Sequence, residues 1–302
     1  MDLNLILRTT TDNYFEFSRC VSFYFSKDVY TPYTSLESTF ITETNDIQQI
    51  KEVLFYVDDN IIHHGLVDSI EFCTLHGYKV IKVKSKGFTS LLCQNQPKPG
   101  LKPDADLPSV MSEFSIPNVT YESTSAMNYI YVKEGSTLWD AAANFNFRLN
   151  GRYPYIEGTN KVRVTLKTPV QKVVSDSEVI KSGVIYDFTK IVSHLHMKDA
   201  EGTYDVFNKN SAFATSRGLI RHKQIPLDVQ YLNDPDSGLL FKLNFSRRGC
   251  QCRYVQYAGY SGEDLNDILT FGDINMQRIK KIELSGGNGS VKTFLGVYSD
   301  AF

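Results

Sequence analysis

Residues 53–67, VLFYVDDNIIHHGLV, decide the class of fold that this chain adopts. Two apolar runs flank Asp58-Asp59-Asn60, and Asp and Asn tolerate the left-handed backbone conformation that a tight hairpin turn requires. His76-Gly77 supplies a second such turn, between the runs at 69–73 and 78–84. This part of the chain therefore predicts antiparallel strands joined by short turns.

Alternating apolar residues extend the pattern over the first third of the chain. Leu3-Leu5-Leu7 and Val21-Phe23-Phe25 place apolar side chains at every second position, as strands with one buried face do. The lysines within 78–84 alternate with apolar residues, so we expect them to face solvent or a partner. Because a strand meander must close or cover its edges, a small β-barrel with a short helix at 88–92 is the economical prediction.

The composition favours a folded, β-rich protein without a strong charge field. A hydrophobic share of 42% in 302 residues is enough for two or three domains with cores of their own. The 18 Tyr and 19 Phe suit half-buried strand surfaces. Lys and Arg number 32 against 34 Asp and Glu, so the net charge of -2 provides no general basic field for nucleic acid.

The N-terminus and the cysteines bear on the compartment. Met1–Arg8 shows no basic segment followed by an apolar run and a cleavage site, and no later stretch approaches about 20 consecutive apolar residues. We therefore expect a soluble chain that is made in the cytoplasm, without membrane insertion. The five Cys are an odd number in a long chain, which predicts free thiols rather than a disulfide framework.

The middle of the chain predicts a linker and then a short β-α-β unit. Three prolines in the polar stretch 94–103 predict a linker or an extended arm without regular hydrogen bonding. A strand is expected at 128–132 and a helix at 138–145, where Thr137 caps the helix and Asp140 adds a favourable charge. A strand at 161–165 completes the unit.

The last part of the chain predicts strands again, with one helix. Strands are expected at 183–188, 191–196, 204–207 and 250–257, and Asp234-Pro235 begins a helix that ends near Arg247-Arg248-Gly249. A terminal hairpin is expected around Gly286-Gly287-Asn288-Gly289. The predicted fold class is mainly β (α+β), with a first barrel in residues 1–95, the linker and β-α-β unit in 96–168, and a second barrel in 169–302.

Candidate metal ligands are few. His63-His64 occupy one predicted strand, where neighbouring side chains point to opposite faces and cannot share a metal ion. His194 and His196 share a face, but the sequence near them supplies no carboxylate or thiolate to complete a ligand shell. Cys250 and Cys252 also share a face, and buried small hydrophobic residues are the better interpretation. No metal or cofactor is predicted.

Catalytic motifs are also missing from the sequence. The loop Gly286–Gly289 lacks the Lys-Ser/Thr pair and the helix of a phosphate-binding loop, and no GxSxG or HExxH occurs. Asp58-Asp59 and Glu263-Asp264 are expected to be solvated turn residues. The basic residues cluster in two places and are interpreted as solvated or interface charge rather than a nucleic-acid site; they are Arg217, Arg221, His222 and Lys223, and then Arg247, Arg248 and Arg253. No catalytic residue is predicted.

Two segments resemble a LysM-like module. Tyr131–Ala142 is similar to its opening and Tyr155–Val164 to its closing strand. The order of motifs over most of the chain, Phe25–Pro32, Gly65–Ile70 and Ser85–Leu92 followed by the LysM-like unit and a second barrel, resembles the baseplate hub family of contractile phage tails, Mu-like prophages and tailocins, which is related to the first part of type VI secretion spike proteins.

The resemblance implies a structural protein of a virion or a tail-like contractile injection particle, assembled in the bacterial cytoplasm. A homotrimer with two barrels per chain would present six similar domains to a hexameric tail tube and a threefold face to a central spike. The implied partners are further copies of the chain, the tail tube or tube-initiator protein, the spike, other baseplate proteins, and tape-measure protein or DNA in the lumen.

Two other functions stay open at the level of the sequence. The LysM-like segment could bind cell-wall glycan, because true LysM domains do so. A tail-associated peptidoglycan hydrolase would need an acid/base pair, for which Glu134 and Glu157 are the candidates to substitute. Scaffold is the favoured interpretation of the segment, and the chain is predicted not to be an enzyme.

Overall fold

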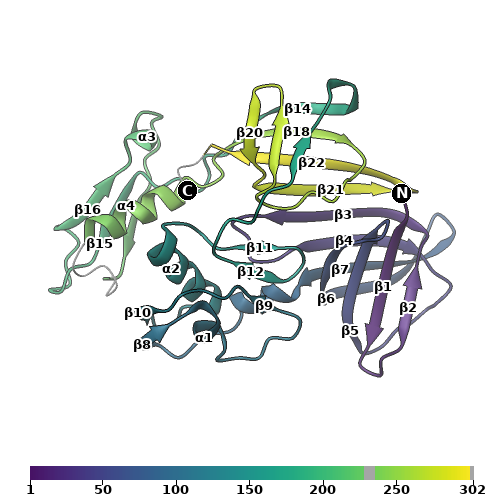
Figure 1. The fold of residues 1–302 in the computed structure, drawn as a ribbon, viewed down its shortest axis with the longest axis horizontal. Coiled ribbons are helices and arrows are strands. Elements are labelled where there is room, and N and C mark those ends of the chain that lie inside the picture. The colour runs from purple at the N-terminus through teal and green to yellow at the C-terminus, as the bar shows by residue number, and fades with distance from the viewer. Residues whose placement is uncertain (228–234, 300–302) are drawn as a thin grey trace. The chain divides into compact units, whose positions relative to one another are not determined.

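The computed structural model describes residues 1–227 and 235–299 and divides the chain into two compact units. Unit 1 comprises Met1–Ser182 and Tyr254–Val297, and unit 2 comprises Gly183–Arg253 with the chain end from Tyr298. Strands are the commonest elements (Figure 1), which confirms the mainly β fold. Among the described residues no helix has the length and apolar character needed to cross a membrane. The barrel borders at 95/96 and 168/169 stay a prediction.

A large sheet forms the frame of unit 1. Its strands follow the order β14-β18-β22-β21-β3-β4-β7-β6-β5-β1-β2, where β14 is Val179–Tyr186, and the pairs from β21 to β2 are antiparallel. The bounds are β1 Leu3–Thr9, β2 Tyr14–Phe17, β3 Cys20–Asp28, β4 Ser35–Ile41, β5 Ile50–Val57, β6 Asn60–Leu75, β7 Tyr78–Gly87, β18 Gln251–Ala258, β21 Lys281–Gly287 and β22 Ser290–Tyr298.

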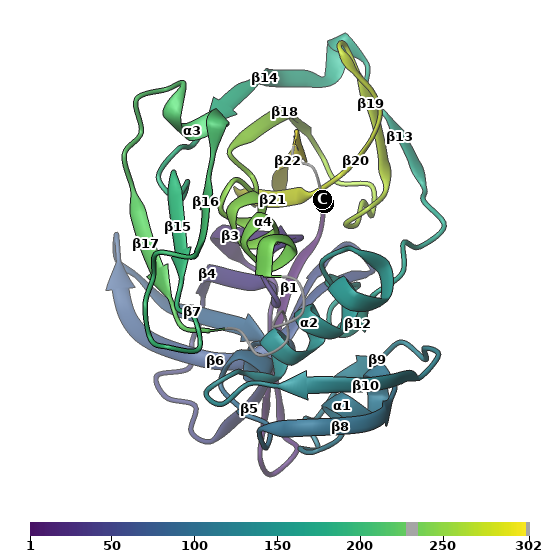
Figure 2. The same ribbon diagram turned by 90° about the vertical axis from the view of Figure 1, so that its left-hand side faces the viewer.

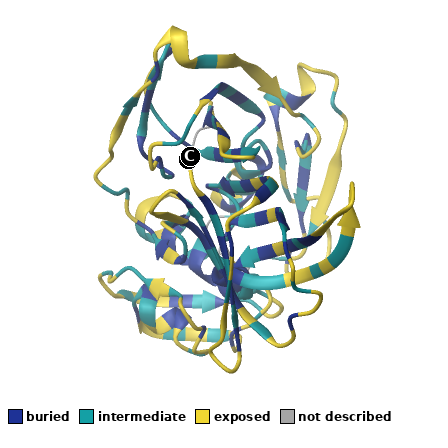
Figure 3. Ribbon diagram, turned by 90° about the vertical axis from the view of Figure 1, so that its right-hand side faces the viewer, coloured by how far each residue is buried: buried dark blue, intermediate teal, exposed yellow. Residues whose placement is uncertain are grey.

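The predicted hairpins are confirmed, together with their local chemistry. Asp58 has a φ of 50° at the exposed turn between β5 and β6, and His76 and Gly77 have φ values of 48° and 83° between β6 and β7. Buried and exposed residues alternate along the strands (Figure 3), as in β1, where Leu5 and Leu7 are fully buried. The residues of the turns and the alternation of apolar and polar side chains therefore determine these hairpins.

Strand β3 joins the first third of the chain to the last third. It pairs with β21, so that Phe25 lies opposite Leu284 and Lys27 opposite Ile282. At this junction a Cβ added to Gly287 would lie 2.1 Å from the Val21 carbonyl oxygen, so only glycine fits. The predicted terminal hairpin is confirmed, because β21 pairs with β22 around the turn at 288–289.

The prediction of a linker at 94–103 is wrong in its second half. Strand β8, Gly100–Ala105, begins inside the stretch and pairs with β10, Met127–Val132, with Pro103 opposite Tyr129. These two strands form a sheet of their own, so β8 is an edge strand. Proline, which lacks a backbone N–H, is tolerated in an edge strand, and this explains why Pro103 can lie in β8. The predicted short helix is present as the 3-10 helix η1, Phe88–Cys93.

The predicted β-α-β unit is present, with a longer helix. Helix α2 spans Leu138–Asn150, where 138–145 was expected, because the first residue that stops it is Gly151 with a φ of 65°. At its start, Asp140 N donates to Thr137 Oγ1 at 3.1 Å and Thr137 N donates to Asp140 Oδ2 at 2.9 Å. The short helix α1, Leu107–Met111, lies against α2.

An apolar core holds this middle region together. Trp139 and Phe145 of α2 pack with Val110 of α1, Ile130 of β10 and Val162, and all five are at least 96% buried. The elements around them are β9 Thr120–Tyr121, β11 Tyr155–Glu157 and β12 Lys161–Arg163, which form one small sheet. Unit 1 is completed by η2 Asp176–Glu178 and by the sheet of β13 Gln171–Val173, β19 Ile268–Phe271 and β20 Ile274–Arg278.

Unit 2 contains a three-stranded sheet covered on one face by a helix (Figure 2). Strand β15, His194–Met197, lies between β16, Phe207–Asn210, and β17, His222–Ile225. Both β15 and β16 lie about three residues later than predicted. Helix α4, Pro235–Ser246, confirms the predicted helix from Pro235, while its predicted start at Asp234 lies outside the described residues.

The remaining elements of this region are short or cross the border of the units. Helix α3 spans Ala212–Thr215. Strand β14, Val179–Tyr186, begins four residues before the predicted 183–188 and is exposed over almost its whole length. The predicted strand at 250–257 is confirmed as β18.

Candidate functional site: a charge network in unit 1

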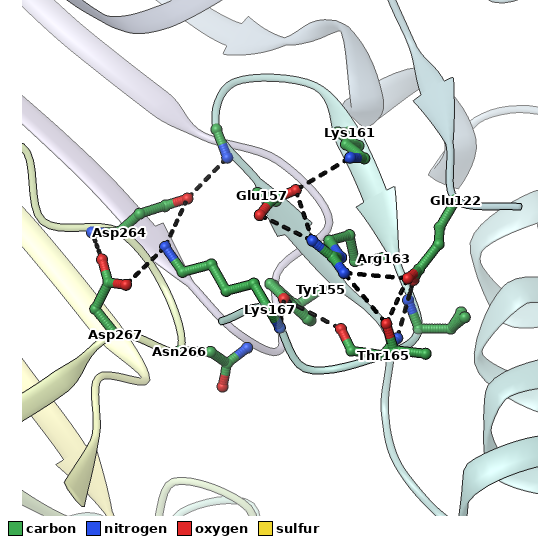
Figure 4. Close-up of polar contacts among 12 residues, drawn as sticks. Glu122, Tyr155, Glu157, Lys161, Arg163, Thr165, Lys167, Asp264, Asn266 and Asp267 are labelled. Atoms are coloured by element: carbon green, nitrogen blue, oxygen red, sulfur yellow. Dashed lines mark hydrogen bonds and ion pairs between the residues drawn. The ribbon is translucent and has the colours of Figure 1, made fainter. Parts of the chain in front are cut away.

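Charged side chains gather around the hairpin of β11 and β12 in unit 1 (Figure 4). The hairpin turns at Gly158, which has a φ of 58°, and pairs Tyr155 with Arg163. Strand β12 also pairs in parallel with β9. The hairpin thus brings residues from three separate stretches of the chain to one place.

Arg163 connects two carboxylates. Its Nη1 donates to both oxygens of Glu157 at 3.1 Å, and its Nη2 donates to Glu122 Oε1 at 3.2 Å. All three side chains are at least 77% buried, so their charges are screened little by solvent. The guanidinium therefore fixes the hairpin to the stretch that follows β9.

Glu122 also organises the backbone after β12. The amides of Val164 and Thr165 donate to Glu122 Oε2 at 2.8 and 3.0 Å, and the Thr165 hydroxyl donates to Glu122 Oε1. Burial raises the pKa of Glu122, but these hydrogen bonds and Arg163 outweigh it, so the pKa lies below the ordinary value. Glu122 is consequently held as a carboxylate.

Lys27 of β3 meets the same hairpin from the large sheet. Its side chain is only 5% exposed, and Nζ pairs with Asp264 and donates to the Gly158 carbonyl oxygen at 2.6 Å. Asp264 in turn accepts a hydrogen bond from Gly158 N at 2.8 Å. One ion pair therefore links β3, the β11–β12 turn and the segment before β19.

Two further lysines complete the network. Lys167 Nζ lies 2.9 Å from Asp267 Oδ1, and Lys172 Nζ lies 3.1 Å from Glu263 Oε1. Tyr257 Oη donates to Glu263, and burial together with the charge of Glu263 raises the pKa of this phenol. Glu263 and Asp267 side chains are both only 3% exposed.

The expectation that Glu263-Asp264 are solvated turn residues is therefore wrong. Lys27 pairs with Asp264 and Lys172 with Glu263, while Lys167 pairs with Asp267 at 2.9 Å and with Asp264 at 3.7 Å. Such buried charges persist because each has an opposite charge and hydrogen bonds. The arrangement holds segments of the chain together, because every carboxylate in it forms an ion pair with a cation.

The other sequence candidates lie apart from this network. His63 is fully buried between Thr34 Oγ1 at 2.8 Å and Ser85 Oγ at 2.7 Å, and burial lowers its pKa to about 3. His64 instead meets Glu52 at 3.1 Å. The two rings have different partners, as the alternation of strand side chains requires.

All five cysteines are free thiols. Cys250 and Cys252 are buried, as expected for small apolar residues. Burial raises the pKa of Cys20 to about 12 and is the main cause that raises the pKa of Cys93 to about 11. Cys20 and Cys93 are therefore poor nucleophiles and poor metal ligands at neutral pH.

Several basic residues of unit 2 pack on aromatic rings. Arg217 and Arg247 lie 3.7 and 4.2 Å from the centre of the Phe213 ring, and Arg248 lies 3.7 Å from that of Phe245. Arg221 donates to the Phe188 carbonyl oxygen. These contacts occupy the guanidinium faces of Arg217, Arg247 and Arg248. The interpretation of the basic residues as solvated or interface charge stays a prediction.

His194 and His196 have His222 as a neighbour, which the sequence analysis had grouped with the basic residues. His222 of β17 lies beside His194 and His196 of β15, because the parallel pairing of these strands sets His194 opposite His222. Within 1–227 and 235–299, no group of three or more His, Cys, Asp or Glu has the arrangement of a metal site. The sequence analysis did not place these three histidines together, because it did not predict that β15 pairs with β17 in this register.

The carboxylates considered for an enzyme are not combined into a pair. Glu157 is engaged by Arg163 and by Lys161, whose Nζ lies 3.3 Å from its Oε2. Glu134 is exposed in the turn before α2. The geometry thus supplies a structural role for Glu157.

The fold places the chain in a known structural class. No protein-family model matches the sequence, and no curated protein matches it either. Solved structures do match, and they include tail proteins and a type VI secretion component. The resemblance to the baseplate and tail hub family that the sequence predicted is therefore confirmed at the level of the fold.

Two tail proteins match over nearly their full length. The tail protein from Neisseria meningitidis MC58 has a TM-score of 0.68 at 13% identity, covering 98% of this chain and 96% of that one. The 43 kDa tail protein of prophage MuSo2 from Shewanella oneidensis has a TM-score of 0.68 at 12% identity, covering 99% and 98%.

A third match belongs to a secretion system. The E. coli c3393 protein, a component of the type VI secretion system described as similar to the T4 tail proteins gp27 and gp5, has a TM-score of 0.52 at 10% identity, covering 93% of this chain and 74% of that one. At these identities the shared property is the fold.

Proposed function

We propose that this chain is the structural baseplate hub of a phage tail or a phage-tail-like contractile particle. In this role it is a trimeric adaptor that joins the hexameric tail tube to the central spike and has no catalytic activity. Each chain contributes two barrel domains, from 1–95 and 169–302, with the LysM-like unit of 96–168 between them as a scaffold.

The match to the Neisseria tail protein carries this proposal. The similarity extends over 98% of this chain, so it concerns the arrangement of the whole chain and not one common domain. Order of elements over such a length is hard to reach by chance in small β domains. The match to the type VI secretion component supports the same class of particle.

The charge network of unit 1 suits a protein that must withstand mechanical force. It ties the β11–β12 hairpin to β3 and to the segment 263–267 through buried ion pairs, and Arg163 adds a two-carboxylate link. Buried pairs of this kind resist separation, because pulling one charge from its partner leaves both desolvated. An adaptor that transmits the force of a contracting tail needs such a fixed central element.

The proposed partners follow from the position in the particle. They are two more copies of the chain, the tail tube or tube-initiator protein, the spike, other baseplate proteins, and tape-measure protein or DNA in the lumen. The net charge of -2 suits a lumen, since a strongly basic wall would hold passing DNA. Assembly takes place in the bacterial cytoplasm before the particle is complete.

The mass of the purified chain in solution tests the proposal. Light scattering should give about three times the chain mass of 34.3 kDa, and negative-stain images should show rings. Mixing with the tube and spike proteins of the same particle should yield a larger complex. A monomer at every concentration, both alone and with those proteins, would contradict the hub assignment.

The glycan-binding and hydrolase alternatives are tested on the same preparation. The full chain is incubated with purified peptidoglycan and sedimented, and a zymogram follows any clearing. The scaffold role predicts no sedimentation and no clearing. Clearing that disappears in Glu134→Gln or Glu157→Gln would replace the hub proposal by an enzymatic one.

A further inference from the structure

Unit 2 carries most of its positive charge in two stretches of sequence that contain no acidic residue. Residues 206–227 and 237–253 together hold eight Lys and Arg and no Asp or Glu. By sequence, unit 2 as a whole has ten Lys and Arg against eight Asp and Glu, whereas unit 1 has 22 against 26. The two parts of the chain therefore have net charges of opposite sign.

Three arginines of these stretches meet at aromatic residues of unit 2. Arg217 follows α3, Arg221 precedes β17 and Arg247 follows α4. Arg217 and Arg247 lie on the same ring, that of Phe213, at 3.7 and 4.2 Å from its centre. Arg217 also lies 5.7 Å from the centre of the Phe188 ring, and the Phe188 carbonyl oxygen accepts a hydrogen bond from Arg221. These three arginines are hereafter the arginine cluster.

No acid neutralises the arginine cluster within residues 1–227 and 235–299, because none of its guanidinium groups forms an ion pair there. Arg217 donates instead to the Phe213 carbonyl oxygen at 3.0 Å. Asp187 lies in the same region, but its carboxylate accepts hydrogen bonds from the amide and the hydroxyl of Thr189 at 2.9 and 2.6 Å. Like charges are thus gathered without a counter-charge, which an anionic partner would supply.

The aromatic rings leave the edges of the guanidinium groups available. A guanidinium that lies on a ring keeps its N–H groups in its own plane, so it can still hold a carboxylate by two parallel hydrogen bonds. Arg217 and Arg221 are exposed. Arg247 Nε is buried and has no hydrogen-bond partner in the part of the chain that the structure describes. The cluster therefore offers donors that suit oxyanions.

An exposed apolar side chain in the same segment favours a protein as the partner. Ile220 lies next to Arg221 in the sequence and is 78% exposed, the largest exposed fraction of any large hydrophobic residue among those described. A phosphate backbone gains little from such a side chain. Protein interfaces combine arginine with apolar contacts, so the surface suits a protein that carries carboxylates.

We propose that the arginine cluster and Ile220 form the surface through which unit 2 of one chain binds unit 1 of a second copy. Charge complementarity selects this partner, because unit 1 is the acidic part of the chain and is present in every copy. Two different surfaces meet in such a contact, so its repetition about a threefold axis closes a ring. The inference rests on the proposed homotrimer and names the surface that forms it.

Light scattering on a dilution series of the full chain tests this surface. Arg217→Glu should raise the concentration at which the trimer dissociates at least about 10-fold, because like charges then face each other. The matched control is Lys198→Glu, the same change of charge at an exposed residue after the end of β15, whereas Arg221 bonds the start of that strand. The control should dissociate like the unmodified chain. Equal dissociation of both variants, with unchanged far-ultraviolet circular dichroism, would overturn the proposal.

A second variant leaves the charge unchanged and separates a protein partner from a nucleic acid. Ile220→Ser should weaken the trimer at least about 5-fold, since an exposed side chain matters to the fold little but to a protein interface more. Duplex DNA is added to the same proteins in a gel-shift assay, and no shift is expected. A shift that Arg217→Glu abolishes, with the trimer mass unchanged, would assign the cluster to phosphates and overturn the proposal.

Cross-linking identifies the partner surface. Trimers assembled from a mixture of ¹⁴N and ¹⁵N chains are treated with a carbodiimide, which joins lysines to carboxylates in direct contact. Mixed-isotope pairs should join Lys223, two residues after Arg221, to Asp or Glu of unit 1. Their absence, or mixed pairs confined to unit 2, would overturn the proposal.

The two proposals fail in different ways. A trimer that both Arg217→Glu and Ile220→Ser leave intact overturns this surface and leaves the hub proposal standing. A chain that is monomeric at every concentration, both alone and with the tube and spike proteins, contradicts both.

Discussion

In unit 1 the charged side chains of Lys27, Asp267 and Glu263 lie inside the fold, and each contacts an opposite charge. In unit 2, Arg217, Arg247 and Arg248 instead pack on aromatic rings. The apolar cores differ in the same direction. The middle region of unit 1 buries one large core that includes Trp139 and Phe145, while unit 2 has two small clusters, one of four buried residues between β15 and α4 and one of three. The comparison indicates that buried ion pairs and a large apolar core stabilise unit 1, whereas unit 2 has fewer such interactions.

Phe145→Ala should have the largest effect. Phe145 is fully buried in the core around α2, so its truncation should lower the free energy of unfolding of unit 1 by about 3 to 5 kcal/mol. Denaturant unfolding followed by the fluorescence of Trp139 measures it. If the loss fell instead on the amide exchange of β15 and α4, the two units would not be the separate bodies that the comparison assumes.

Asp264→Asn should come next. It leaves the Lys27 ammonium, 5% exposed, without its opposite charge and should destabilise the fold by about 3 kcal/mol. The double variant Lys27→Met, Asp264→Leu removes both charges, and it should recover much of the loss. Equal losses in the single and the double variant would show that the pair contributes packing rather than electrostatics.

Acid should destabilise unit 1 through His63. The pKa of His63 is about 3 in the folded chain, while an unfolded histidine titrates near 6.5. The unfolded state therefore takes up the proton first, and stability is full above pH 6.5 and falls as the pH drops toward 3. At pH 4.5 the loss from this group is about 2 to 3 kcal/mol. Urea unfolding between pH 4.5 and 7.5 should show this slope, and His63→Gln should reduce it.

Leu243→Ala should cost less in unit 2 than Phe145→Ala in unit 1. Leu243 belongs to the four-residue cluster under β15, where a small core can close around the gap, so a loss of about 2 kcal/mol is expected. Hydrogen exchange of the β15 amides should accelerate accordingly. A loss as large as that of Phe145→Ala would mean that the cluster of Leu195, Met197, Leu239 and Leu243 cannot close around the gap.

Lys84→Gln should have the smallest effect. Lys84 pairs with Glu37 across β7 and β4 at 3.0 Å, but both side chains are about 60% exposed. Solvent screens such a pair, so the change should stay below about 0.5 kcal/mol. The same assay as for Asp264→Asn makes this the surface control. A comparable loss in both variants would remove the distinction between buried and surface pairs.

Local elements were predictable because their causes are local. Asp58 and His76-Gly77 specify turns by themselves, and Thr137 with Asp140 specifies the start of α2. The pairing of β3 with β21 was not predictable, since no short-range pattern records which distant strand lies alongside. Strand β8 was missed because a proline in an edge strand has the same local signature as a proline in a linker.

The site was predictable only in part. Glu263-Asp264 have turn chemistry, and their burial follows from the cations brought to them by distant segments. One signal did exist: Lys27 continues the inward alternation of Phe23 and Phe25, so a lysine occupies a position whose neighbours are buried. Such a residue needs an acid inside the fold. The identity of that acid is a property of the tertiary structure.

The pairing of Phe25 with Leu284 also means that β3 waits for its partner strand while the ribosome makes the rest of the chain. At about 5 to 20 residues per second, the ribosome needs on the order of tens of seconds to make the segment between them. During that time the β3 edge that later receives β21 has no permanent neighbour. The first hairpins can form early, but β3 is paired with β21 only when the final strands leave the ribosome. A nascent chain stalled before residue 281 therefore exposes the edge of β3 as a template for strand addition by other chains.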